Sequence, residues 1–177
     1  MTLSRLMLAL LAAVLISAGC SCGGGEYTLY TDEAGGFAIS HPTDWEQVPQ
    51  EEVPEGILVI FRPTVTCGNV SESINVVEGT LPGPMTLDDW FADKQAPLSS
   101  LGEYTPISTD KVTVNGREAI KHVYTALGAP STIVQAMQLY VMDGMSVWIV
   151  TCRCDPACYD GYEAMFDAVV RSFRVLD

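Results

Sequence analysis

Apolar and polar residues alternate along much of the chain after residue 27, as they do in half-buried β-strands. One apolar run, Ile57–Phe61, is continuous and bounded by Gly56 and Pro63, which predicts a buried central strand. Hairpin turns are predicted at Asn115-Gly116 and at Asp143-Gly144. The predicted strands are Gly36–Ser40, Ile57–Phe61, Ser73–Thr80, a strand around Val112 and Val114, Arg117–Ala126, Thr132–Met142 and Met145–Cys152.

Two segments instead repeat their apolar residues at intervals of three and four, the spacing of one face of a helix. The first begins after Thr86, which is placed to cap the helix together with Asp89. The second begins after Asp160, with Glu163 in the reciprocal capping position, and its apolar stripe ends at Phe173. Strands joined by hairpins, with only two helices among them, predict one α+β domain with an antiparallel sheet over residues 27–177.

The start of the chain has the layout of a secretory signal. Arg5 supplies a positive charge, Leu6–Ile16 is apolar, and small residues follow up to Cys20. The sequence S-A-G-C resembles the bacterial lipobox, whose cysteine is lipidated and becomes the new N-terminus. Ser17 stands where that motif most often has Leu. The alternatives are an ordinary cleaved signal peptide with a cysteine nearby, and lipidation at Cys22.

The expected organisation is therefore a signal peptide over 1–19, a lipidated cysteine and Gly-rich tether over 20–26, and one folded domain. Several acyl chains on Cys20 would anchor the domain stably, where a single chain is marginal. This organisation predicts a bacterial protein of the cell envelope, held at the extracytoplasmic face of a membrane. The lipid would be its only contact with that membrane.

Composition narrows the choice of partner. The 177 residues include 22 Asp and Glu against 9 Lys and Arg, a net charge of −13. Nucleic acids and anionic membrane surfaces reward clustered basic residues, so this balance argues against both. The remaining expectation is a protein partner or a small ligand near the membrane surface.

The order of motifs resembles that of PsbP-like domains. A Gly-Phe strand at Gly36-Phe37 runs into a Pro-x-x-Trp turn at Pro42–Trp45. A strand containing Asn75, a helix beginning T-L-D-D-W, a strand ending N-G-R-E-A and a last helix ending in Ser172-Phe173 follow in the same order. The resemblance implies an α/β/α sandwich with a central antiparallel sheet, and no enzymatic activity. Members of that family include photosystem II extrinsic subunits, a Ran-binding nucleotide-release factor and bacterial lipoproteins.

Four cysteines remain in the domain, Cys67, Cys152, Cys154 and Cys158. In an oxidising compartment four cysteines most simply form two disulfides, and three pairings are possible. We expect Cys154, placed in the loop after the last strand, to pair locally with Cys158, and Cys67 to pair with Cys152. The alternative is a metal-handling or redox protein that uses this cluster with His41 or His122.

Motifs for catalysis are missing from the sequence: it has no G-x-S-x-G, H-E-x-x-H, P-loop or dinucleotide fingerprint. Both histidines are interpreted as structural. The acidic residues around Pro49 and Pro54 are interpreted as a solvated loop, with a calcium site as the alternative. The three tryptophans, Trp45, Trp90 and Trp148, are assigned to the core. The sequence thus predicts a non-enzymatic binding or scaffolding module without a cofactor.

Overall fold

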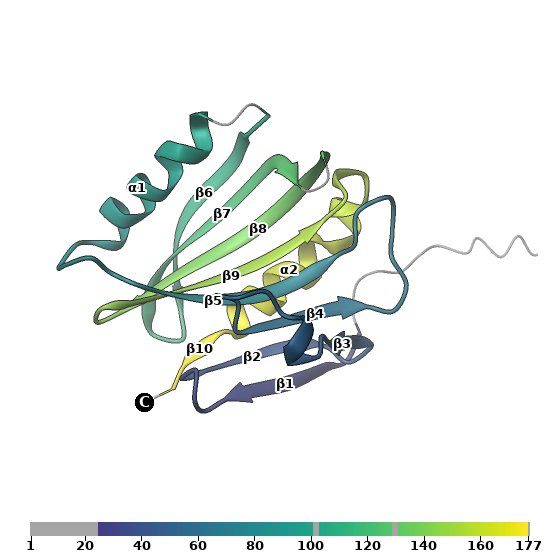
Figure 1. Ribbon diagram of the computed structural model, residues 1–177, viewed down its shortest axis with the longest axis horizontal. Coiled ribbons are helices and arrows are strands. Elements are labelled where there is room, and N and C mark those ends of the chain that lie inside the picture. The colour runs from purple at the N-terminus through teal and green to yellow at the C-terminus, as the bar shows by residue number, and fades with distance from the viewer. Residues whose placement is uncertain (1–24, 101–102, 129–130, 177) are drawn as a thin grey trace, which may run out of the picture.

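The computed structural model describes residues 25–100, 103–128 and 131–176. A seven-stranded antiparallel sheet has the strand order β3-β4-β5-β9-β8-β7-β6, and a second sheet has the order β1-β2-β10 (Figure 1). The strands are β1 Tyr27–Asp32, β2 Phe37–Pro42, β3 Trp45–Gln47, β4 Val59–Pro63, β5 Ser73–Thr80, β6 Thr105–Val114, β7 Arg117–Gly128, β8 Thr132–Asp143, β9 Ser146–Cys154 and β10 Arg174–Val175. Single turns of 3-10 helix lie at η1 Gln50–Glu52 and η2 Pro156–Cys158.

Helix α2 (Tyr159–Ser172) packs on one face of the large sheet, where it contacts β8 and β9, and it also contacts β2 of the small sheet. Its predicted apolar stripe is confirmed, with Phe166 and Val169 fully buried. The predicted start is wrong by two residues. The helix begins at Tyr159, and Cys158 at its N-cap makes no side-chain capping bond. The preceding turn is capped instead by Asp155, whose carboxylate accepts a hydrogen bond from the backbone N–H of Ala157.

Helix α1 (Leu87–Ser100) covers part of the opposite face of the large sheet (Figure 1). The predicted cap is confirmed: the Thr86 hydroxyl accepts from the N–H of Asp89 at 3.1 Å and donates to its carboxylate at 2.7 Å. Trp90 is buried from this helix against Ile120 and Tyr140. The large sheet therefore has a helix on each face, as an α/β/α sandwich requires. The second sheet lies beside β3 and β4 at the lower edge of the large sheet (Figure 1), where Tyr30 and His41 pack on Phe61 of β4.

The hydrophobic pattern located seven of the ten strands in the described residues, whereas β1, β3 and β10 were not predicted, and strand ends were placed less well. Strand β5 matches its predicted range, whereas β6 begins at Thr105, well before the predicted Val112. Strand β9 runs on to Cys154, so this cysteine lies in the sheet and not in a loop as expected. The cause is that β9 stays paired with β8 up to the pair Gln135–Cys154.

The main core fills the space between the large sheet, α2 and the small sheet. Trp45 and Trp148 are buried there, while Trp90 belongs to the smaller cluster under α1, which confirms the assignment of all three to apolar interiors. Backbone pairing of β10 with β2 brings the end of the chain back beside its first hairpin. None of the helices in the described ranges is long and apolar enough to cross a membrane.

Candidate functional site

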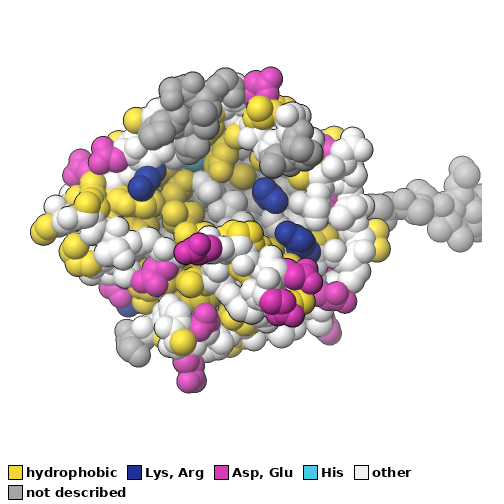
Figure 2. All heavy atoms as spheres, in the orientation of Figure 1, with side chains coloured by type: hydrophobic (Ala, Val, Ile, Leu, Met, Phe, Trp, Pro, Cys, Tyr) yellow, Lys and Arg dark blue, Asp and Glu magenta, His cyan; other side chains and the backbone are white. Residues whose placement is uncertain are grey.

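The face of the large sheet that carries α1 is only partly covered. Strand pairing aligns Ser73 with Arg153, Arg153 with Ala136, and Ala136 with Tyr124, so these side chains form one row across β5, β9, β8 and β7. Figure 2 shows this face hollowed, with hydrophobic side chains in the depression and basic side chains on its right-hand side. The row thus crosses an open part of the sheet.

A cleft of about 490 Å³ opens over this row, and we call it the sheet cleft. Its volume lies in the range of roughly 300–1,000 Å³ that is typical of small-molecule sites. Aliphatic side chains from β7 and β8 line one part, and polar side chains from β5 and β9 line another. Its lining includes Asn75, Tyr104, Tyr124, Leu127, Val134 and Arg153.

Arg153 is the charged group of the sheet cleft. Its Nε donates to the hydroxyl of Ser73 at 3.0 Å, which holds the side chain across β5. Arg62 lies on β4, and continuing the pairing of Phe61 with Ile74 by one residue places it opposite Ser73. Burial, and then the neighbouring charge of Arg62, lower the pKa of the Arg153 guanidinium. Two like charges therefore face each other across a serine.

Neither arginine has a carboxylate within salt-bridge distance among the described residues. Glu46 stands directly across from Arg62 in the β3–β4 ladder, yet it forms no ion pair with it. Four other basic side chains do form such pairs: Lys111, Arg117, Lys121 and Arg171. In a chain with a large excess of carboxylates, two unpaired guanidinium groups at one place set this site apart.

Aromatic side chains form the wall of the sheet cleft next to α1. The rings of Tyr104 and Tyr124 lie 5.3 Å apart, and Tyr124 stacks on His122 at 5.2 Å. Burial and the nearby Tyr104 raise the pKa of Tyr124 to about 12, while Arg153 acts in the opposite direction. The Tyr124 hydroxyl therefore stays protonated at neutral pH and can donate a hydrogen bond.

His122 serves this wall as a structural residue. It is 2% exposed, with Nε2 2.6 Å from the Tyr104 hydroxyl and Nδ1 2.9 Å from the Ser108 carbonyl. The Nδ1–H donates to that carbonyl, and Nε2 lies against the oxygen of Tyr104, whose hydroxyl also donates to Oε1 of Gln95. Burial lowers the pKa of the imidazole, and both ring nitrogens are occupied. The side chain positions Tyr104 at the sheet cleft.

A second hollow of about 420 Å³ lies beside the start of α1, against β6 and β7. Its one lysine, Lys111, donates to Asp88 at 2.5 Å across it. The cation of this hollow therefore already has an acidic partner in the protein. The sheet cleft is therefore the better candidate for a ligand site.

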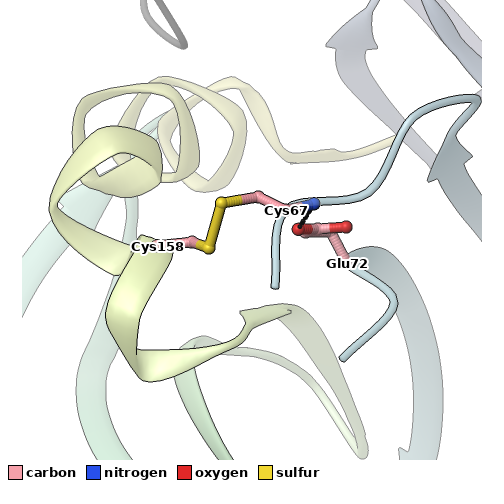
Figure 3. Close-up of side chains that lie close together, drawn as sticks. All are labelled: Cys67, Glu72 and Cys158. Atoms are coloured by element: carbon pink, nitrogen blue, oxygen red, sulfur yellow. Dashed lines mark hydrogen bonds between the residues drawn. A yellow bond between two sulfur atoms is a disulfide. The ribbon is translucent and has the colours of Figure 1, made fainter. Parts of the chain in front are cut away.

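The expected cysteine pairing is wrong. The structure joins Cys67 to Cys158, with Cα atoms 6.2 Å apart, and leaves Cys152 and Cys154 as free thiols (Figure 3). Cys152 and Cys154 are two residues apart on β9, so both point into the core. Cys158 lies beyond the end of that strand, at the turn that approaches the β4–β5 loop. Proximity across this loop decided the pairing.

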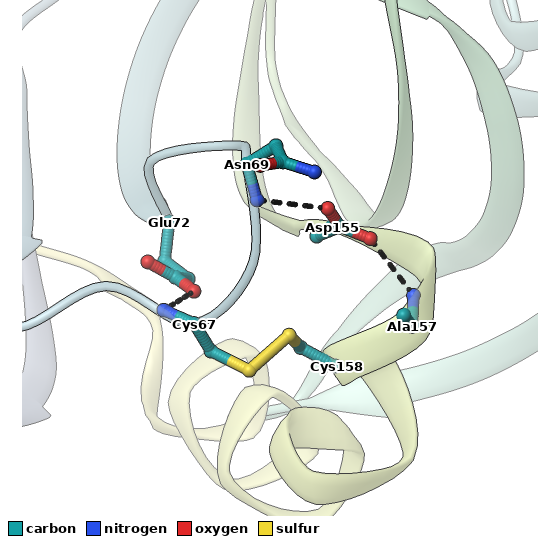
Figure 4. The surroundings of a disulfide bond; sticks show 6 residues. All are labelled: Cys67, Asn69, Glu72, Asp155, Ala157 and Cys158. Carbon is teal, nitrogen blue, oxygen red and sulfur yellow. Dashed lines mark hydrogen bonds between the residues drawn. A yellow bond between two sulfur atoms is a disulfide. The ribbon is translucent and has the colours of Figure 1, made fainter.

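Hydrogen bonds hold the same loop against the turn (Figure 4). The Asp155 carboxylate accepts from the backbone N–H of Asn69 at 3.0 Å as well as from Ala157, and these bonds lower its pKa. The carboxylate of Glu72, which is fully buried, accepts from the backbone N–H of Cys67 at 2.7 Å. The disulfide is thus one part of a closed joint between distant segments.

The structure argues against the alternative of a metal site at the cysteine cluster. Within the described residues, one group of possible ligands lies within 4.8 Å, namely Cys67, Glu72 and Cys158, and both of its sulfurs are in the disulfide. Burial, followed by nearby carboxylates, raises the pKa of Cys154 to about 12, and burial raises that of Cys152. Protonated, buried thiols are poor ligands and poor nucleophiles.

His41 is also packed as a structural residue. Its ring stacks on Phe61 at 4.1 Å, and Nδ1 lies 2.9 Å from the Pro42 carbonyl. It lies far along the sequence from each cysteine, and neither histidine belongs to the group of possible metal ligands found in the described residues. The acidic residues around Pro49 and Pro54 are exposed, as a solvated loop requires. The predicted signal segment, Cys20 and Cys22 lie outside the described residues.

Sequence reasoning missed the sheet cleft. The available signal was alternation: Arg153 interrupts an apolar strand between two inward-facing cysteines, and Arg62 follows a buried run in β4. Each would be read alone as an exposed arginine. Only the order of strands in the sheet brings β4 and β9 to either side of β5.

Comparison with known proteins supports the architecture. No family model matches the sequence, and no curated protein does. Among solved structures, cyanobacterial PsbP (CyanoP) from Synechocystis sp. PCC 6803 is 20% identical with a TM-score of 0.62, over 91% of this chain and 98% of that chain. The Ran-binding protein Mog1p of Saccharomyces cerevisiae is 12% identical with a TM-score of 0.64, over 87% and 97% of the two chains.

LpqN of Mycobacterium tuberculosis, described as involved in cell envelope biogenesis, is 12% identical with a TM-score of 0.64. The match covers 88% of this chain and 87% of that one. These likenesses span nearly the whole domain at low identity, so they establish the arrangement of strands and helices and leave the site to be argued from its own residues. The chain has the PsbP-like fold.

Proposed function

We propose that this chain is a lipid-anchored, extracytoplasmic binding module without enzymatic activity, and that the sheet cleft holds its ligand. The observation that carries the proposal is the cleft itself: apolar and aromatic walls enclose polar groups from three strands, together with an arginine that has no acidic partner. Concave sites of this volume and lining are where small ligands bind.

The structural neighbours are compatible with binding as the role of this fold. Mog1p is a Ran-binding protein, and LpqN is involved in cell envelope biogenesis. A binding role on this chain needs no catalytic group. The histidine nearest the cleft, His122, is buried, and its two ring nitrogens contact Tyr104 and Ser108 of the protein itself, which supports a structural role.

The location is proposed from the sequence. Lipidation at Cys20 would place the domain on a tether of only a few residues, because 20–26 separate it from the lipid. A Gly-rich tether of that length spans roughly 15 Å. The binding module would then work close to the membrane. Without Arg5 it has 8 Lys and Arg against 22 Asp and Glu, a net charge of −14 that would oppose lying flat on anionic lipid.

The test is mass spectrometry of the protein extracted from its own membrane. The denatured chain should have the mass of a triacylated protein that starts at Cys20, and C20S should lose the lipid. Under native conditions the wild type should carry an additional bound mass. A126W, which fills the sheet cleft, should lose that mass, and A168W, at an exposed site on α2, should keep it.

Two results would overturn the proposal. A bound mass that A126W keeps would place the ligand elsewhere. The second result is that the wild type carries no bound mass and that A126W captures the same molecules as the wild type. The sheet cleft would then not be a binding site.

A further inference from the structure

The two unpaired arginines identify the kind of ligand. Of the eight basic residues that the structure describes, Arg62 and Arg153 are brought together without an acidic partner, and Arg153 is half-buried. Burial of a cation is costly unless an anion or strong hydrogen bonds compensate. Among the described residues Arg153 donates one side-chain hydrogen bond, from Nε to Ser73, which leaves the outer nitrogens of its guanidinium for another acceptor.

The spacing of the strands lets both cations reach one anion. Arg62 on β4 and Arg153 on β9 are separated by one strand, so their backbones lie about 10 Å apart. Ser73, the residue between them, has a short side chain over which both long side chains can lean. A planar guanidinium presents two parallel N–H groups, the geometry that matches a carboxylate or a phosphate.

Hydrogen-bond donors and acceptors next to the arginines extend this polar end. Asn75 and Thr151 are paired across β5 and β9, and both line the sheet cleft. The Tyr124 hydroxyl, close enough to Arg153 to feel its charge, adds a donor on the other side. The polar groups converge from three strands on one end of the cleft.

The rest of the cleft is apolar. Ala126, Leu127 and Val134 come from the paired ends of β7 and β8, with Ala136 on the floor beside Arg153. Val134 is 8% exposed and Ala136 is 2% exposed, so the apolar end of the cleft lies close to the floor of the sheet. An occupant that satisfies both ends has one anionic group and an apolar body.

We propose, resting on the proposed function, that the sheet cleft binds a small organic anion, with the anionic group at Arg153 and Arg62 and the apolar body along Ala126 and Val134. The remainder of the protein is strongly acidic and repels anions at long range. Selectivity therefore comes from short-range contacts inside the cleft, and a small ligand that enters it experiences these cations more than the distant carboxylates.

The experiment is calorimetric titration of the full mature chain in phosphatidylcholine nanodiscs, with empty nanodiscs as the blank. The probes are octanoate, octyltrimethylammonium and inorganic phosphate. Octanoate should bind, the cation of equal chain length should not, and phosphate should bind more weakly because it lacks an apolar body. Raised salt should weaken octanoate binding.

Three arginine variants assign the anion end. R153Q should weaken octanoate binding by about 10- to 100-fold, the loss expected for hydrogen bonds to a charged group. R62Q, at an exposed position, should weaken it by about 3- to 10-fold and decides the matter if R153Q does not fold. R174Q removes an exposed charge from the other sheet and should leave the affinity unchanged.

Equal binding of octanoate and octyltrimethylammonium, or wild-type affinity in R62Q and R153Q, would overturn the inference. The native bound mass separates this failure from that of the proposed function. If the bound mass is a neutral ligand that A126W loses, the inference of an anionic ligand fails and the proposed binding site stands. If no bound mass depends on Ala126, both the proposed binding site and the inference of an anionic ligand fail.

Discussion

The two faces of the large sheet are built from the same strands and differ in how they are closed. On β9, Val150, Cys152 and Cys154 point toward α2 and are fully buried, whereas Thr151 and Arg153 point to the other face and line the sheet cleft. The inner face is sealed by a helix, a second sheet and a disulfide. Among the described residues, the outer face is covered by α1 at one end only.

The comparison shows that the inner face of the sheet contributes most to the stability of the fold, and that the outer face leaves space for a ligand. A complete apolar layer and a covalent joint stabilise the inner face, because each buried side chain there has close neighbours. The outer face keeps a half-buried charge, which costs stability and is useful only with an occupant. Substitutions on the inner face should therefore change folding, and those on the outer face should change binding.

Removal of the disulfide is the change with the largest expected effect. The bond closes a loop with a sequence separation of 91, so C67S with C158S should lower the free energy of unfolding by about 4.5 kcal/mol on the chain-entropy model. Urea denaturation measures the loss, and reduction of the wild type should reproduce it. C154A keeps the disulfide and should keep its sensitivity to reduction. If octanoate affinity fell as much as stability, the two faces would not be independent.

Truncation of one buried side chain on each face sharpens the contrast. F166A removes a fully buried ring of α2 and should lower the free energy of unfolding by about 3–5 kcal/mol. V134A removes a smaller side chain from the wall of the sheet cleft and should lower it by only about 1–2 kcal/mol while weakening octanoate binding. Thermal denaturation and calorimetry of the two variants test this, and comparable losses of stability would contradict it.

Acid should affect the inner face through His41. Burial lowers the pKa of this imidazole below its usual value, so the folded protein holds it neutral. Above a pH of about 6.5 both the folded and unfolded states are neutral and stability is complete. As the pH falls below that value the unfolded chain takes up the proton first, and stability is lost until the folded pKa is passed.

The measurement is an NMR titration of the imidazole ring protons together with urea denaturation at pH 7 and pH 5. His41 should titrate below 6.5. H41F, which keeps a ring against Phe61, should lose less stability between the two pH values than the wild type does. A titration of His41 above 6.5 would reverse the sign and contradict the interpretation of burial.

The smallest expected effect lies at the edge of the open face. Glu46 stands across from Arg62 without an ion pair, so its charge competes weakly for that guanidinium. E46Q should strengthen octanoate binding by about twofold at low salt, the scale of an exposed charge pair, with unchanged stability. E51Q, on the exposed η1 turn, is the matched control and should leave the affinity as it is. Weaker binding in E46Q would mean that Glu46 contacts the ligand.

Local pattern was sufficient for much of the fold. Alternation found β5 and the long hairpins of β7, β8 and β9, and a three- and four-residue spacing found the buried stripe of α2, because these periods are properties of short stretches of chain. The order of those elements was also enough to indicate a PsbP-like arrangement. The ends of strands were placed less accurately, since they depend on how far a neighbouring strand continues.

The sequence by itself determined which residues of each strand and helix face an apolar interior. Only the tertiary structure decided which cysteines meet and which charges stay unpaired. Cys67 reaches Cys158 because the β4–β5 loop folds over the turn before α2, and Arg62 meets Arg153 because β5 separates their strands by a single position. Both meetings join segments far apart in the chain, and a sequence pattern carries no information on distances across a sheet.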